Sequence, residues 1–204
     1  YLQAVSELLP YVDGYKLASY ELTWPAMLRE VAKTGKPVVL ATGAATMDEV
    51  ARAVETLWHA GCSDLTLLHC VSSYPTPIAD ANLRTIRTMR NHFWDDHWIK
   101  FGWSDHTRSE GVIQRAVQRY AVDMVEFHLD LDGSGAEYHK GHCWLPNQAQ
   151  AMIKNAREGL LCDGDGFKLP APSEEQEVLW RSDPVDGLRP FKCERTTEKI
   201  LARL

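Results

Sequence analysis

Short runs of apolar residues recur along the first 130 positions, and segments whose apolar residues follow helical spacing separate these runs. Strands that are apolar throughout, rather than in alternation, are typical of a parallel sheet buried on both faces. We therefore predict five parallel strands joined by helices, which is the α/β fold class. The predicted strands cover residues 15–19, 38–41, 65–70, 98–103 and 122–128.

The helical segments carry start signals. Thr46 followed by Glu49 is a capping box, and Pro25 and Pro146 stand where a first helical turn accepts proline. Residues 130–141 are polar and contain glycine, so we predict a loop there. The predicted helices cover residues 2–9, 25–34, 47–60, 83–90, 109–120 and 146–161.

The C-terminal part of the chain has a different character. From Gly164 onward the sequence is polar and contains four prolines, with no strand pattern and no repeat. We predict two parts: a domain at residues 1–163 and a proline-containing, irregular extension at residues 164–204. The extension is expected to pack on the domain or on a partner.

Polar side chains follow each predicted strand. One such ending is usually a helix cap, but five in succession indicate a site, because parallel strands bring their carboxyl ends to one edge. These side chains are Lys16, Ser19, Glu21, Thr42, His69, Ser72, Ser73, Tyr74, Ser104, Asp105, His106 and His128.

His106 and His128 follow consecutive strands and are a candidate metal-binding pair. Neutral imidazoles bind divalent ions, and Asp105 or a neighbour would hold a ring in orientation. His69 lies inside an apolar run and is either a core histidine or a site residue. Lys16 is a strand-end lysine reaching solvent, a phosphate-binding cation or a Schiff-base amine. Weaker candidates, in a polar loop, are His139 and His142.

The composition excludes several classes of protein. Of 204 residues, 45% are hydrophobic and 25% charged, as in ordinary globular domains. The net charge of −6 and the lack of a basic block argue against nucleic acid as a partner. No apolar run approaches the ~20 residues of a membrane span. Five scattered cysteines suit a reducing compartment, so we expect a cytoplasmic protein that binds neither nucleic acid nor membrane.

Five segments at the strand ends carry a resemblance in their order and spacing. They are Tyr15–Glu21 (YKLASYE), Gly35–Gly43 (GKPVVLATG), Leu67–Pro77 (LLHCVSSYPTP), Gly102–Thr107 (GWSDHT) and Val125–His128 (VEFH). Together they resemble the sialic acid synthase (N-acetylneuraminate synthase) family over about residues 10–160.

The resemblance implies a (β/α)8 barrel that condenses phosphoenolpyruvate with an N-acylated mannosamine-type aldose, giving a nine-carbon 2-keto acid and phosphate. It also implies a divalent ion, Mn²⁺ or Mg²⁺, acting as a Lewis acid on the aldehyde. By position, His106 and His128 are the implied metal ligands, and Glu21 joins them as a catalytic residue. The implied substrate contacts are Lys16, Ser19, Ser72 and Ser104 for phosphoenolpyruvate, Glu21 and Tyr74 for the sugar, and Thr42 beside them.

Departures from the family pattern change these expectations. The family's first three strands have no counterpart, so we predict a partial TIM barrel covering about the last five βα units. A longer chain, a homodimer or another oligomer would complete it. Residues 133–141 replace a Pro-Gly-Pro-Asp loop, with Glu137 as a candidate for its sugar-binding Asp. Ala18, Tyr20 and Ala41 replace two glycines and a serine, which leaves the acceptor sugar open.

Two other functions stay open. A Schiff-base aldolase using Lys16 would leave the two histidines without a role. A non-catalytic barrel subunit that needs a partner chain accounts for the missing strands, but not for the retained strand-end residues.

Overall fold

The computed structural model describes residues 1–191 and 194–195. The chain divides into two compact units, residues 1–162 and 163–204. The division falls beside the domain boundary predicted at residue 163. Each unit is described by itself, and all strands of the described residues lie in the first.

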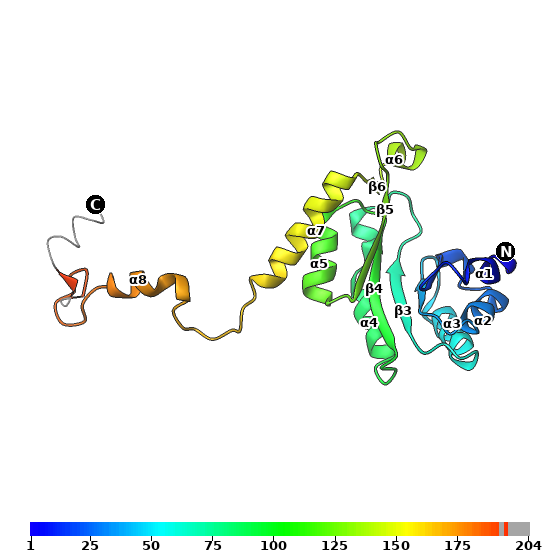
Figure 1. Cartoon of the computed structure of the whole chain (residues 1–204), viewed down its shortest axis with the longest axis horizontal. Helices are drawn as coiled ribbons and strands as arrows, with labels where there is room; N and C mark the ends of the chain where they lie inside the picture. The colour runs from blue at the N-terminus through cyan, green and yellow to red at the C-terminus, as the bar shows by residue number, and fades with distance from the viewer. Residues whose placement is uncertain (192–193, 196–204) are drawn as a thin grey trace. The chain divides into compact units, whose positions relative to one another are not determined.

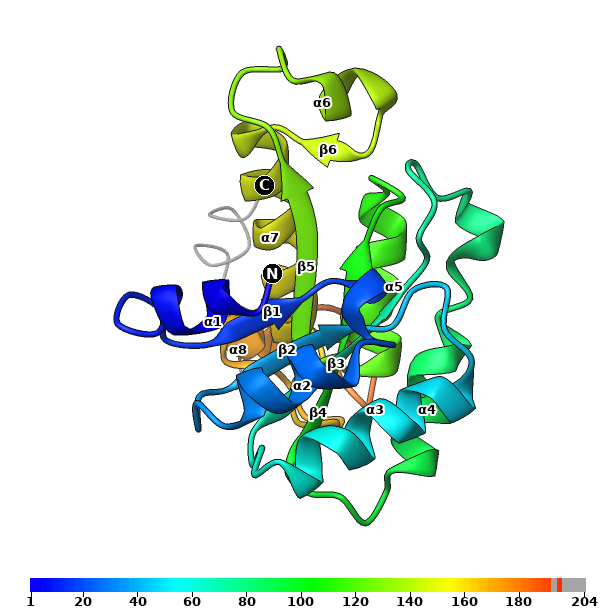
Figure 2. The ribbon, with the colours of Figure 1, turned by 90° about the vertical axis from the view of Figure 1, so that its right-hand side faces the viewer.

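The first unit contains six parallel strands that pair in sequence order. Figure 2 shows the strands fanning from the nearly horizontal β1 to the upright β5, so the sheet curls like part of a barrel wall. This arrangement confirms the predicted partial TIM barrel. The strands are β1 (Tyr15–Leu17), β2 (Val38–Ala41), β3 (Leu65–Cys70), β4 (Ile99–Asp105), β5 (Met124–Leu129) and β6 (Cys143–Trp144).

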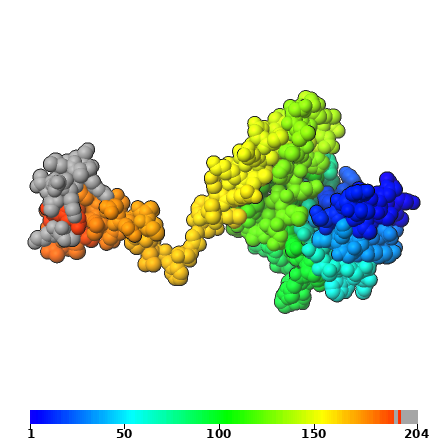
Figure 3. All heavy atoms as spheres, in the orientation of Figure 1, coloured from blue at the N-terminus to red at the C-terminus, as the bar shows by residue number. Residues whose placement is uncertain are grey.

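Helices connect the strands and cover the outer face of the sheet (Figure 1). The capping box is present, with Thr46 and Glu49 each accepting a hydrogen bond from the other's backbone N–H. In Figure 3 the N-terminal segment (blue) and α7 (yellow) lie on opposite sides of the first unit. The α-helices of this unit are α1 (Gln3–Leu8), α2 (Pro25–Ala32), α3 (Met47–His59), α4 (Arg84–His92), α5 (Glu110–Tyr120), α6 (Ala136–Lys140) and α7 (Pro146–Leu161).

Three local predictions need correction. The first strand stops at Leu17, and the 3-10 turn η1 (Ser19–Glu21) follows it. Helix α6 lies inside the predicted loop at 130–141. The two-residue strand β6 was not predicted, because a pair of residues is too short to give a periodic pattern.

The two faces of the sheet have different neighbours. Leu67, Phe101 and Trp103 belong to the main hydrophobic core beneath the helices. On the inner face Leu68 pairs with Gly102. A Cβ on Gly102 would lie 2.5 Å from the Met124 carbonyl oxygen and still closer to Leu68, so only glycine lets these strands approach. The pairing registers place Lys16, Ala41, Leu68, Cys70, Gly102, Ser104 and Glu126 on this inner face.

His69 faces outward and is a core histidine. Its Nε2 lies 3.0 Å from the Ala81 carbonyl oxygen in the 3-10 turn η2 (Ile78–Ala81). Its ring packs against Trp103, with centroids 5.3 Å apart. Burial lowers the pKa of His69, so the neutral ring donates one hydrogen bond and fills the helix-facing core.

The described residues of the second unit are mostly irregular, as predicted, but they include a 3-10 turn, η3 (Pro172–Glu174), and the short helix α8 (Glu175–Leu179). Within this unit the Arg195 guanidinium donates two hydrogen bonds to the Asp186 carboxylate. This pairing lowers the pKa of Asp186 to about 2. Across the described parts of both units, no helix combines the length and apolar character needed to cross a bilayer.

Candidate active site

Lys16 and Glu126 meet across the inner face of the sheet. Their side chains form an ion pair, with Nζ 3.1 Å from Oε1, and both are about one-third exposed. Burial alone would raise the pKa of Glu126, but the Ser104 hydroxyl and the Lys16 ammonium outweigh it, and the net pKa is lowered. The carboxylate therefore holds a cation at the edge where the strands end. The sequence analysis gave Glu126 no role, although it alternates with the outward-facing Val125 and Phe127.

Gly43 lies beside the hydroxyl groups of Ser19 and Ser72. Its N–H donates to Ser19 Oγ at 2.9 Å. A Cβ on Gly43 would lie 2.8 Å from Ser19 Oγ and would overlap Ser72 Oγ. Ser72 Oγ is buried and has no hydrogen-bond partner among the described residues. A buried hydroxyl without a partner is costly, and an anion accepting its proton would satisfy it. Ser19, Gly43 and Ser72 are called the serine recess below.

Two predicted residues are placed differently. The Thr42 hydroxyl donates to the Leu68 carbonyl oxygen at 3.0 Å, so it serves the sheet at the end of β2. Glu21 ends the 3-10 turn after β1 and is partly exposed. Their proposed contacts with substrate stay predictions.

His106 has a defined tautomer. Its Nδ1 lies 2.8 Å from the Val71 carbonyl oxygen, and a carbonyl only accepts, so Nδ1 carries the proton. Nε2 is then left with a lone pair that can bind a cation, the usual arrangement for a histidine ligand. Burial lowers the pKa of His106, and the neighbouring His128 lowers it further, which favours the neutral ring.

His128 lies beside His106 at the end of the next strand. The ring centroids are 5.1 Å apart, and Tyr74 packs against both, with centroid distances of 4.2 Å to His106 and 5.9 Å to His128. His128 Nδ1 lies 3.2 Å from Glu137 Oε2. The structure thus brings together the predicted histidine pair and Tyr74, and it adds Glu137 to them.

Asp105 supports the loop after β4 rather than an imidazole. Its carboxylate is fully buried and accepts hydrogen bonds from the indole N–H groups of Trp103 (3.1 Å) and Trp144 (3.4 Å). It also accepts from the Thr107 hydroxyl and the Arg108 N–H. The sequence predicted that Asp105 or a neighbouring group would orient an imidazole. The neighbouring group that orients His106 is the Val71 carbonyl.

Replacing Asp105 by alanine is expected to lower the free energy of unfolding by about 3 kcal/mol, because buried indole and backbone donors lose their acceptor. Urea denaturation at constant pH measures the change. Asp95, an exposed aspartate, provides the control, and its replacement by alanine should shift stability by no more than about 0.5 kcal/mol. An unchanged urea midpoint in Asp105→Ala would contradict this role.

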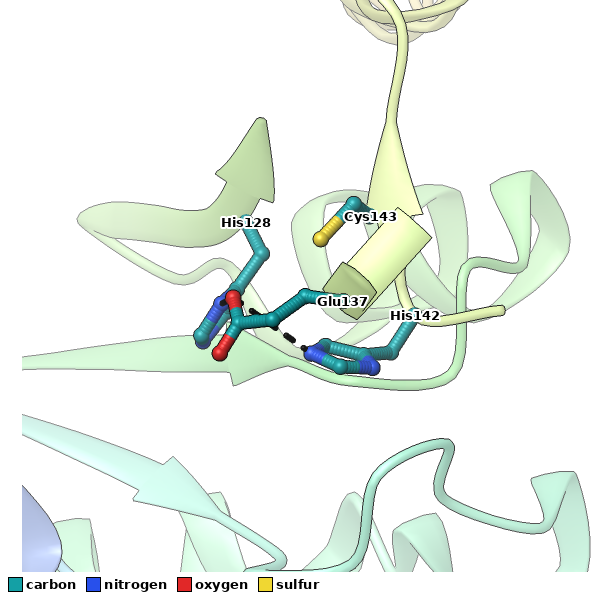
Figure 4. A group of neighbouring side chains, drawn as sticks. All are labelled: His128, Glu137, His142 and Cys143. Atoms are coloured by element: carbon teal, nitrogen blue, oxygen red, sulfur yellow. Dashed lines mark hydrogen bonds and ion pairs between the residues drawn. The ribbon is translucent and has the colours of Figure 1, made fainter. Parts of the chain in front are cut away.

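A second group of side chains lies next to His128 (Figure 4). His128, Glu137, His142 and Cys143 each place one ligand atom within 4.8 Å of the other three. His142 was a weak candidate in a polar loop, but its side chain is only 2% exposed. The sequence feature that could have indicated burial of His142 is the apolar pair Cys143–Trp144 that follows it. This pair forms a strand against the end of β5 and so places His142 beside that strand.

These features define the class of domain: the chain forms part of a (β/α)8 barrel. Hydroxyl, lysine and histidine side chains gather at the carboxyl ends of its strands. The chain belongs to the NeuB family, which it matches over residues 2–168. Membership confirms the resemblance found in the strand-end segments.

Two relatives match about four-fifths of this chain. An N,N'-diacetyllegionaminic acid synthase of Campylobacter jejuni is 32% identical over 168 residues, which are 80% of this chain and 48% of that protein. An uncharacterised protein of Methanocaldococcus jannaschii is 38% identical over 169 residues, 82% of this chain and 48% of its own. The chain thus spans about half the length of the curated relatives it matches.

A solved structure supports the fold. The N-acetylneuraminic acid synthetase of Leptospira borgpetersenii, in complex with citrate, superposes with a TM-score of 0.70 and 27% identity. The match covers 87% of this chain and 59% of that one. The described sheet therefore corresponds to part of a known synthase fold.

Proposed function

We propose that the protein carrying this chain condenses phosphoenolpyruvate with an N-acylated amino-sugar aldose, giving a nine-carbon 2-keto sugar acid and phosphate. The observation that carries the proposal is the serine recess and Lys16 lying at the same strand ends as the histidine pair. Membership of a family with legionaminic and N-acetylneuraminic acid synthases supports the reaction class.

The serine recess and Lys16 are assigned to phosphoenolpyruvate. Ser72 Oγ and Ser19 Oγ both lie close to Gly43, where the absence of a side chain lets the two hydroxyls approach the backbone. Hydroxyl donors around an anion fix its position, and the Lys16 ammonium adds a positive charge at the same edge. Ser104 completes this group beside Glu126.

The histidine pair fits a divalent ion, Mn²⁺ or Mg²⁺ in our proposal. His106 has a free Nε2 lone pair fixed by the Val71 carbonyl, and the neutral form is favoured by burial. When bound, such an ion supplies Lewis-acid polarisation of the aldehyde oxygen. Tyr74 packs against both rings and holds their relative orientation.

Glu21 and Tyr74 are assigned to the acceptor sugar, whose hydroxyls would accept and donate hydrogen bonds there. The exposed Tyr20 beside Glu21 differs from the family's glycine and changes the shape of this side of the site. We therefore propose only the class of the acceptor sugar, an N-acylated aldose, and not a particular sugar of that class.

The cellular setting is also a proposal. Cys62, Cys70, Cys143 and Cys162 are free thiols in the structure, which suits the cytoplasm. A homodimer or another oligomer is proposed as the active form, because the described sheet has two open edges, β1 and β6, whose backbone groups could pair with further strands.

Phosphate release from phosphoenolpyruvate tests the function. With a panel of N-acylated aldoses, we expect release that depends on both the sugar and Mn²⁺. Two results would contradict the proposal: phosphate release in the absence of any sugar, or no phosphate release with any sugar of the panel. Borohydride trapping with pyruvate distinguishes this function from that of a Schiff-base aldolase, because a covalent adduct on Lys16 would favour the aldolase. We expect no adduct, since Glu126 forms an ion pair with the Lys16 ammonium and a Schiff base requires the free amine.

A further inference from the structure

The segment between β5 and β6 places a set of metal-binding side chains next to the site. His128 comes from β5, Glu137 from α6, His142 precedes β6 and Cys143 begins it. Figure 4 shows Glu137 between the two imidazoles. The four side chains each offer one ligand atom, and these four atoms all lie within 4.8 Å of one another. These four residues are called the β5–β6 cluster.

The spacing of the ligand atoms suits one tetrahedral ion. Metal bonds of about 2.0–2.3 Å to nitrogen, oxygen and sulfur require ligand atoms roughly 3.3–3.8 Å apart. Glu137 Oε2 lies 3.2 Å from His128 Nδ1 and 3.8 Å from His142 Nε2. Small side-chain movements would bring the remaining pairs into this range.

His142 is the observation that points to a ligand. Its side chain is 2% exposed, and neither ring nitrogen has a hydrogen-bond partner among the described residues, since Nε2 has only the 3.8 Å ion-pair contact with Glu137 Oε2. Buried polar atoms are normally paired, and an unpaired one needs an explanation such as an ion. In its neutral form an imidazole offers one lone pair that can bind such an ion.

We propose that His128, Glu137, His142 and Cys143 bind a borderline divalent cation such as Zn²⁺, with Cys143 coordinating as the thiolate. A donor set that includes sulfur and two imidazoles favours Zn²⁺ or Co²⁺ over Mg²⁺ or Mn²⁺. Cysteine binds such ions as the thiolate, so the Cys143 thiol releases its proton when the ion binds. The ion joins α6, none of whose residues is buried, to the ends of two strands.

The inference shares His128 with the histidine pair of the proposed function, but it needs neither substrate nor His106. At neutral pH an imidazole that binds an ion through one nitrogen keeps its proton on the other. His128 therefore serves one ion at a time, and variants of His106 and Cys143 separate the two sites.

Titration of the purified protein with Co²⁺ tests the inference. A thiolate ligand gives a thiolate-to-cobalt charge-transfer band, which we expect in the wild-type protein and in His106→Ala. The band should be lost in Cys143→Ser and retained in Cys162→Ser, whose thiol is exposed and outside the cluster. Excess Zn²⁺ should displace Co²⁺ and remove the band.

Glu137→Gln provides a second test in case the Cys143 variant does not fold. The Glu137 side chain is 61% exposed, so its replacement should not disturb folding. This variant should keep the band but bind Co²⁺ at least about 10-fold more weakly, since a neutral amide replaces an anionic ligand. Absence of the band in the wild type, or its persistence in Cys143→Ser, would overturn the inference. Phosphate release is measured separately, so a failure of the proposed reaction is distinguishable from a failure of this site.

Discussion

Replacing His106 or His128 by alanine is expected to lower the rate of phosphate release from phosphoenolpyruvate about 10³-fold. Lewis-acid stabilisation is worth several kcal/mol, and each 1.36 kcal/mol corresponds to a tenfold change in rate. His106 offers a lone pair fixed by the Val71 carbonyl, and the His128 ring lies 5.1 Å away. The measurement is continuous phosphate detection across a range of Mn²⁺ concentrations.

His59 provides the matched control, because it is an exposed histidine near the end of α3. His59→Ala should keep the wild-type rate and the same dependence on Mn²⁺. Far-ultraviolet circular dichroism confirms that the site variants are folded. A wild-type rate in either His106→Ala or His128→Ala would show that the histidine pair does not take part in turnover.

The strands that build the site were predictable from sequence because their signal is local. Residues 38–41 and 65–70 are continuous apolar runs, and both appear as strands with the predicted bounds. A strand buried on both faces is apolar at most of its positions, so its pattern does not depend on the rest of the fold. The polar residues after each run then reach one edge simply because the strands are parallel.

The environment around His128 was not predictable in the same way. His142 approaches it only because Cys143 pairs with His128 in the sheet. This pairing links residues across an intervening loop and helix, and two residues of strand leave no pattern in sequence. Asp105 illustrates the same limit, since one of its indole partners, Trp144, lies 39 positions away.

Alternation along β4 and β5 contained information that the sequence analysis did not use. Trp103 and Phe127 face outward, so Ser104 and Glu126 must face inward, where Glu126 meets Lys16. Successive side chains of a strand point to opposite faces, so polar residues at every second position mark one face of a buried strand. The roles assigned to the inward residues stay predictions until substrate binding is measured.

Replacing Gly43 by alanine is expected to lower kcat/KM for phosphoenolpyruvate by about 10- to 100-fold while leaving the protein folded. The added Cβ would lie 2.8 Å from Ser19 Oγ and overlap Ser72 Oγ, so it would displace both hydroxyls. Losing one hydrogen bond to a charged group costs about 1.5–3 kcal/mol, which gives this range. Steady-state kinetics at saturating sugar measure the effect, and KM should account for most of it.

Gly111 is the matched control, because it lies in α5 and a Cβ there would meet only Ser109 Oγ at 3.9 Å. Gly111→Ala should leave kinetics unchanged and stabilise the helix by about 0.5–1 kcal/mol, since alanine loses less backbone entropy on folding. The two variants make the same chemical change, so the difference isolates the recess. A normal KM for phosphoenolpyruvate in Gly43→Ala would mean that the substrate's anionic groups bind elsewhere along the strand ends.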